Sequence, residues 1–112
     1  MEELNSMEHC KTIHESLRYL RNLRNLTQEA LGDRIGVDQS YIAQIETQGK
    51  IPSPEAIIGI LEILNVNSTD LAHIKKQYYQ ALSKVLDKVG VKFEELERKR
   101  QTEERKTKNK DR

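Results

Sequence analysis

Apolar residues recur at steps of three and four positions between Lys11 and Leu64, with short polar segments between the apolar groups. This spacing is typical of amphipathic helices, and connections this short are typical of helices that pack closely together. We therefore expect an all-α fold. The pattern predicts four short helices, over residues 11–24, 28–35, 39–47 and 54–64.

The residues at the ends of these segments are typical of helix caps. Thr27, Asp38 and Ser53 each stand just before a helix, where a side-chain oxygen can accept a hydrogen bond from a free amide of the first turn. Pro54 suits a first turn because that position needs no amide donor. Gly36 is expected to end the second helix, because glycine adopts a left-handed conformation at little cost.

Aliphatic residues on one side of each helix form the predicted core. The fourth helix carries so many of them that we expect it to be nearly surrounded. The predicted core residues are Ile13, Leu17, Leu20, Leu31, Ile35, Ile42, Ile45, Ile57, Ile58, Ile60, Leu61 and Leu64.

A fifth helix is predicted from Asn67 or Ser68 to Val89, and we expect Gly90 to end it. Its apolar stripe is longer than a small four-helix core can cover, so its second half needs a partner chain or the last segment to pack upon. We expect dimerisation through this part. The candidate dimer residues are Tyr78, Leu82, Val85 and Val89.

The two ends of the chain are expected to lie outside the packed structure. Residues 1–10 are interpreted as a flexible N-terminus. Residues 97–112 contain no apolar residue but 8 Lys/Arg and 4 Asp/Glu, which predicts a fraying helix that ends in a charged, disordered tail. The expected organisation is thus a helical domain over 11–71, a helical extension over 72–96 and the tail.

Composition agrees with one small intracellular domain. The chain has 112 residues, of which 36% are apolar and 33% charged, and its formal net charge is +1. No apolar run is long enough to span a membrane, the N-terminus lacks the features of a signal peptide, and the single Cys10 can form no internal disulfide. A soluble cytoplasmic protein is expected. Charge is uneven, because residues 1–66 carry 6 Lys/Arg against 10 Asp/Glu while residues 67–112 carry 13 against 8.

Catalytic chemistry has little support in the sequence. No glycine-rich phosphate loop or nucleophile motif is present. His9, Cys10 and His14 are close in sequence, but they lack a fourth ligand at the spacing of a tetrahedral metal site. We expect no enzymatic activity, no metal site and no cofactor.

The stretch "QEALGDRIGVDQSYIAQIET" combines a short helix, a turn with Gly36 and a second helix. Gly32 is small where the two helices would approach most closely. This arrangement fits the helix-turn-helix unit, although glycine turns between short helices also occur in other helical proteins.

The surrounding sequence resembles the lambda-repressor-like, or XRE/Cro, helix-turn-helix family over residues 13–72. The most specific parts are "LTQEAL", "IGVDQSYIAQIE", a Gly before "PSPEAI" and "LEILNVNSTDL". The family's usual Glu-X-Gly is replaced here by Glu46-Thr47-Gln48-Gly49. The resemblance implies a five-helix domain that binds operator DNA in a sequence-specific way, as a homodimer, to regulate transcription.

The resemblance also implies roles for individual residues. The family's base-reading positions fall on Gln39, Ser40 and Gln44, and amide and hydroxyl groups are competent to bond base edges in the major groove. Without the resemblance, these residues also fit an ordinary solvated helix face.

Other positions are expected to contact phosphates or to hold the fold. Gln28 at the start of the second helix, together with Gln48 and Lys50, are the phosphate candidates. Tyr41 could cover the core or place its hydroxyl on a phosphate. Arg21 and Glu46 match family positions that form a structural ion pair.

We therefore expect a repressor that reads the major groove with the helix over residues 39–47. The alternative is a protein-interaction module on the same scaffold, such as an antitoxin or a switch protein controlled by a regulatory partner. The negative charge of residues 1–66 favours this alternative. A steep loss of affinity with salt would favour DNA. The basic tail could assist DNA binding or serve only as a solvated end.

Overall fold

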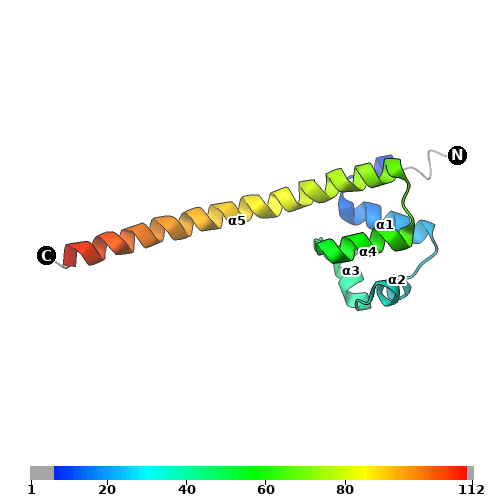
Figure 1. Cartoon of the computed structure of the whole chain (residues 1–112), viewed down its shortest axis with the longest axis horizontal. Coiled ribbons are helices and arrows are strands. Elements are labelled where there is room, and N and C mark those ends of the chain that lie inside the picture. The colour runs from blue at the N-terminus through cyan, green and yellow to red at the C-terminus, as the bar shows by residue number, and fades with distance from the viewer. Residues whose placement is uncertain (1–6, 111–112) are drawn as a thin grey trace. The chain divides into compact units, whose positions relative to one another are not determined.

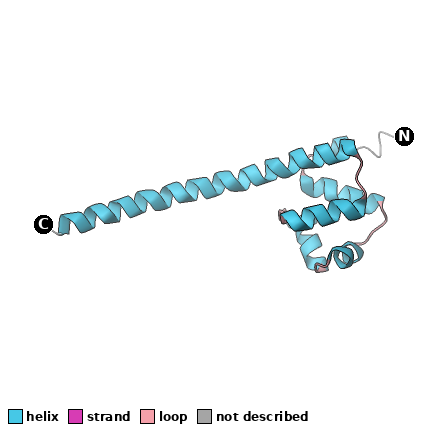
Figure 2. Ribbon diagram, in the orientation of Figure 1, coloured by secondary structure: helices cyan, strands magenta, loops and turns pink. Residues whose placement is uncertain are grey.

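The structure of the chain is a computed structural model that describes residues 7–110. Figures 1 and 2 show that the described part consists of helices joined by short loops, which confirms the expected all-α class. The chain divides into two compact units, of which the first ends at Ala81 and the second begins at Leu82. The elements are a 3-10 helix, η2 (Met7–His9), and the helices α1 (Ile13–Leu23), α2 (Gln28–Ile35), α3 (Gln39–Gln48), α4 (Pro54–Leu64) and α5 (Ser68–Lys110).

The predicted helix ends are mostly found in the structure. Thr27 accepts a hydrogen bond from the Ala30 amide at 3.0 Å, and Ser53 accepts one from the Ala56 amide at 3.2 Å. Gly36 ends α2 with a φ of 76°, in the left-handed region. Asp38 stands at the N-cap of α3, but its side chain makes no capping hydrogen bond. The start of α3 must therefore be fixed by packing.

The core of the first unit is formed by aliphatic side chains from all five α-helices. Ile58 departs from the expectation that α4 is nearly surrounded, because it is 58% exposed. It lines an open pocket between α4 and the start of α5. The most deeply buried large side chains are Ile13, Leu20, Leu31, Ile42, Ile45, Ile60, Leu64 and Ile74.

Polar contacts tie the first part of α5 to the rest of the first unit. The buried side chain of Gln77 accepts a hydrogen bond from the Ser16 hydroxyl at 2.6 Å and donates one to the Cys10 carbonyl oxygen at 3.0 Å. Tyr78 is half-buried and donates to the Pro52 carbonyl oxygen at 2.8 Å. The predicted domain boundary at residue 71 is therefore too early, and Tyr78 belongs to this packed unit rather than to a free dimer surface.

The expectation of a flexible N-terminus is wrong for residues 7–10. Met7 is 2% exposed and Cys10 is 4% exposed, and the Cys10 amide donates to the Met7 carbonyl oxygen. These side chains pack because they are apolar and lie beside α1 and α5. Residues 1–6 lie outside the described residues.

The predicted break at Gly90 is also wrong, since α5 continues through it to Lys110. Glycine inside a helix costs about 1 kcal/mol relative to alanine, which weakens a helix without ending it.

The charged segment over 97–110 is helical rather than disordered. Glu, Lys and Arg are strong helix formers, and Lys92 pairs with Glu95 and Arg100 with Glu104 along the helix. Residues 111–112 lie outside the described part. Within residues 7–110, no helix is both long enough and apolar enough to cross a membrane.

We expect Gly90→Ala to stabilise the second unit by about 1 kcal/mol, because alanine loses less backbone entropy in a helix. The space around Gly90 is open, so the methyl group of alanine would contact no neighbouring side chain there. The measurement is helix content by circular dichroism during thermal unfolding of the full chain. Gly90→Pro should lower helix content instead, and equal helix content in both variants would contradict a continuous α5.

Candidate nucleic-acid interface

Helix α3 has a buried side and a solvent-facing side. Ile42 and Ile45 are each 1% exposed and pack in the core, whereas Gln39 and Ser40 are exposed at the first turn. Gln44 is half-buried one turn later. The helix thus presents amide and hydroxyl groups outward from an aliphatic base.

An ion pair joins α3 to α1. Arg21 Nε donates to Glu46 Oε2 at 2.7 Å, and Arg21 Nη2 donates to Glu46 Oε1 at 2.8 Å. The side chains of Arg21 and Glu46 are only 9% and 2% exposed. Arg21 Nη1 also donates to the Leu26 carbonyl oxygen at 2.6 Å. The hydrogen bond to Glu46 raises the pKa of Arg21 above its ordinary value, so the guanidinium stays charged at any pH near neutrality.

Gln28 extends this contact toward the N-terminus of α3. Its Nε2 donates to Glu46 Oε1 at 3.1 Å, and its Oε1 accepts from Gln39 Nε2 at 3.5 Å. A side-chain amide has two N–H donors, so the second donor of Gln28 stays available for a phosphate. The proposed phosphate residue and the first proposed base-reading residue therefore share one hydrogen-bonded chain with the ion pair.

A second set of contacts joins Gln44 to the segment after α3. Lys50 Nζ donates to Gln44 Oε1 at 3.0 Å and lies 5.0 Å from the centre of the Tyr41 ring. The Tyr41 oxygen accepts a hydrogen bond from the Ser53 amide at 3.0 Å. Tyr41 is half-buried against the core, and no group of residues 7–110 accepts a hydrogen bond from its hydroxyl. Covering the core and donating to a phosphate are therefore compatible roles for Tyr41.

The segment after Glu46, which differs from the family's usual Glu-X-Gly, still ends α3 at a glycine. The helix runs through Gln48, and Gly49 caps it with a φ of 70° in the left-handed region. The Lys50 amide donates to the Gln44 carbonyl oxygen at 3.2 Å. Gln48 and Lys50 are exposed at this end.

One cation proves to have a structural role that the sequence pattern did not indicate. Arg24 donates to the carbonyl oxygens of Leu64 at 2.7 Å and of Asn65 at 3.1 Å, at the C-terminus of α4. A cation at this end of a helix bonds otherwise unpaired carbonyl groups and is stabilised by the helix dipole. A local sequence pattern cannot indicate this contact, because Arg24 and Leu64 are 40 positions apart.

Comparison with known proteins agrees with this geometry. A family model described as helix-turn-helix matches residues 17–71. The chain is 30% identical over 60 residues to the uncharacterised HTH-type transcriptional regulator YazB of Bacillus subtilis (strain 168), a match that covers 54% of this chain and 87% of that protein.

The chain belongs to the XRE-like helix-turn-helix family. This confirms the resemblance seen in the sequence. Membership supports a DNA-binding transcription regulator, a class that is generally not enzymatic. Among the described residues of this helix-turn-helix protein, no three His, Cys, Asp or Glu side chains gather as metal ligands would.

We expect Arg21→Met to destabilise the protein by about 3 to 5 kcal/mol, because it leaves the Glu46 carboxylate buried without a counter-charge. The free energy of unfolding, measured in urea, checks this. The double variant Arg21→Met, Glu46→Leu should lose less stability than the sum of the losses in the two single variants. Arg18→Met is the matched control, since Arg18 is an exposed arginine of the same helix. A loss as large in the control as in Arg21→Met would show that the pair has no special role.

Proposed function

We propose that this protein is a sequence-specific regulator of transcription that binds double-stranded DNA as a homodimer and acts as a repressor. The observation that carries the proposal is the solvent-facing side of α3, where Gln39, Ser40 and Gln44 project from a helix fixed by a buried core and an ion pair. An α-helix of this kind fits the major groove of B-form DNA.

The three proposed base-reading residues have suitable hydrogen-bonding groups. A glutamine amide can donate to N7 and accept from the N6 amino group of the same adenine, and serine can donate or accept. Gln44 Oε1 already accepts from Lys50, but an amide oxygen has two lone pairs, so it can also accept from a base. Gln39 must release its 3.5 Å contact with Gln28, which is long and weak.

The proposed phosphate contacts lie at both ends of α3. Gln28 stands at the first position of α2, where free amides and the helix dipole favour an anion. Gln48 and Lys50 lie at the other end, where Lys50 Nζ is 5.0 Å from the centre of the Tyr41 ring. Arg21 and Arg24 bond protein groups instead, so we assign neither to phosphate binding.

An apolar stripe on the second unit supports the proposed homodimer. Leu82, Val85, Val89 and Leu96 follow the spacing of a two-stranded coiled coil, which is interrupted at Lys92. Val85 is 43% exposed and Val89 is 41% exposed. Leu86 adds to this exposed stripe, and Phe93 and Leu96 extend it beyond Gly90, because α5 does not end there.

The dimer would place two α3 helices on half-sites about one DNA turn apart, roughly 34 Å. A protein that occupies such a site within a promoter excludes the transcription machinery by occlusion. Repression is therefore the simplest output of this architecture.

The exposed stripe also supports the second candidate, a protein-interaction module in which a regulatory partner packs on α5. Salt dependence separates the two functions. DNA affinity falls steeply with salt because bound counterions are released, whereas association through apolar burial depends little on salt.

Selection of bound sequences from a random duplex pool, at two salt concentrations, tests the proposed function. We expect a two-fold related consensus and weaker binding at the higher salt concentration. An unenriched pool at both concentrations would contradict specific DNA binding and favour the protein-interaction module.

We expect Gln44→Ala to relax discrimination at one base pair of the selected site, at a cost of about 1 to 3 kcal/mol. Affinities for single-base variants of the site measure this. Lys50→Gln is the comparison, because loss of a phosphate contact should weaken all sequences alike and lower the salt slope by about 1. If Gln44→Ala also weakened all sequences equally, Gln44 would position α3 rather than read a base.

For the dimer, Val89→Lys should shift the full chain toward monomer, because it places a charge in the apolar stripe. Val91→Lys is the matched control, with the same change two positions away on the opposite side of the helix. Sedimentation equilibrium over a range of protein concentrations measures both. A dimer of unchanged affinity in Val89→Lys would place the interface elsewhere.

A further inference from the structure

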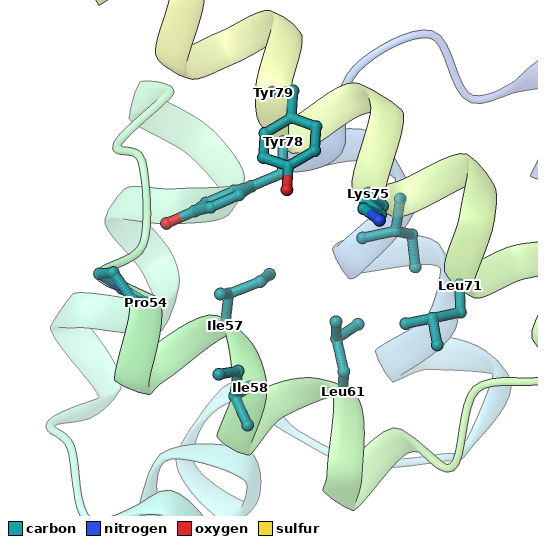
Figure 3. Close-up of a pocket in the computed structure, with 9 residues that line it drawn as sticks. Pro54, Ile57, Ile58, Leu61, Leu71, Lys75, Tyr78 and Tyr79 are labelled. Atoms are coloured by element: carbon teal, nitrogen blue, oxygen red, sulfur yellow. The ribbon is translucent and has the colours of Figure 1, made fainter.

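The first unit contains a pocket between α4 and the beginning of α5 that the proposed function does not use. Its volume is about 330 Å³, within the range of about 300 to 1,000 Å³ that is usual for small-molecule sites. Figure 3 shows side chains from the two helices around it. From α4, the lining consists of Pro54, Ile57, Ile58 and Leu61.

The α5 side of the pocket adds apolar surface and one charge. Leu71 is 45% exposed and Tyr79 is 59% exposed, so both offer surface to a ligand. Lys75 is the only charged residue of the lining, and its Nζ lies 6.0 Å from the centre of the Tyr79 ring. No carboxylate among the described side chains forms an ion pair with Lys75. The Tyr78 hydroxyl proton is already donated to Pro52.

We propose that this pocket binds a small amphipathic carboxylate, with its aliphatic or aromatic body between α4 and α5 and its carboxylate against Lys75. The apolar lining favours the body of such a ligand, and the single unpaired ammonium group selects an anionic head over a neutral or cationic one. The small volume favours a small molecule over a helix from another chain. The heptad stripe on the second unit suits such a helix better.

A ligand in this pocket would contact two residues, Pro54 and Tyr78, that adjoin or bond the segment connecting α3 to α4. Pro54 and Tyr78 line the pocket, and Tyr78 bonds the Pro52 carbonyl oxygen. The next residue, Ser53, bonds Tyr41 of α3, and Tyr41 packs under Lys50. The bound carboxylate therefore changes DNA affinity through the segment over residues 49–53, a consequence that rests on the proposed function.

Titration of the isotope-labelled full chain with octanoate and with 1-octanol, without DNA, tests the site. Octanoate should bind saturably and shift amide resonances of α4 and of residues 71–79. Lys75→Gln should weaken octanoate binding about tenfold, the loss of one charge-assisted bond, and change 1-octanol binding less than twofold. Lys76→Gln is the matched control, an exposed neighbouring lysine outside the lining, and should change neither.

A second variant keeps the test independent of Lys75. Ile58→Glu removes apolar surface and adds a negative charge at an exposed position, so it should abolish octanoate binding while circular dichroism shows an intact fold. Unchanged octanoate affinity in Lys75→Gln, absence of saturable binding, or resonance shifts confined to other parts of the chain would overturn the proposal. So would pocket resonances that change with protein concentration alone, because a second copy would then fill the pocket.

The effect of the ligand on DNA affinity is measured in a separate experiment. Octanoate should change the affinity of the wild-type protein for its selected DNA site, and Tyr78→Phe should remove this change while octanoate still binds. Unchanged DNA affinity in the wild type would overturn the regulatory part of the proposal. The titration without DNA reports on the pocket even if the protein binds no DNA, so failure of the site and failure of the proposed function are distinguishable.

Discussion

The placement of α3 depends on the nearly buried ion pair between Arg21 and Glu46. A carboxylate that is 2% exposed must keep its counter-charge, because an unpaired charge in a protein interior is strongly unfavourable. Two parallel hydrogen bonds fix the direction of the pair as well as its distance. Since Gln28 bonds the same carboxylate, the start of α2 is set relative to α3 by this one group. The contacts with α1 and α2 thus determine the orientation of the solvent-facing side of α3.

Much of the fold could be predicted from the sequence because its signals are local. The caps at Thr27 and Ser53 and the left-handed Gly36 lie within a few residues of the helix ends they determine. The end of the domain could not be predicted in this way, because Gln77 is held by Ser16 and Cys10, more than 60 positions away. Gly90 does not end α5 for a different reason, since one unfavourable residue does not outweigh the strong helix formers around it.

In the candidate site too, the sequence predicts the local features but not the contacts between distant segments. The Arg21–Glu46 pair was expected from the family resemblance, and the outward direction of Gln39 and Ser40 follows from helix periodicity. The contacts of Gln28 with Glu46 and of Gln44 with Lys50 depend on how helices and loops meet in space, which periodicity does not specify. For Tyr41, two roles that looked exclusive in the sequence become compatible once the Ser53 amide is seen to bond its oxygen.

The two sides of α3 differ in their freedom to change during evolution. Ile42 and Ile45 are enclosed, so nearly any substitution there creates a cavity or a clash. Gln39 and Ser40 are exposed, and neither side chain packs in the core. Substitutions at these two positions can therefore accumulate without a loss of stability, and drift at the protein surface is enough to carry such a scaffold from one binding target to another.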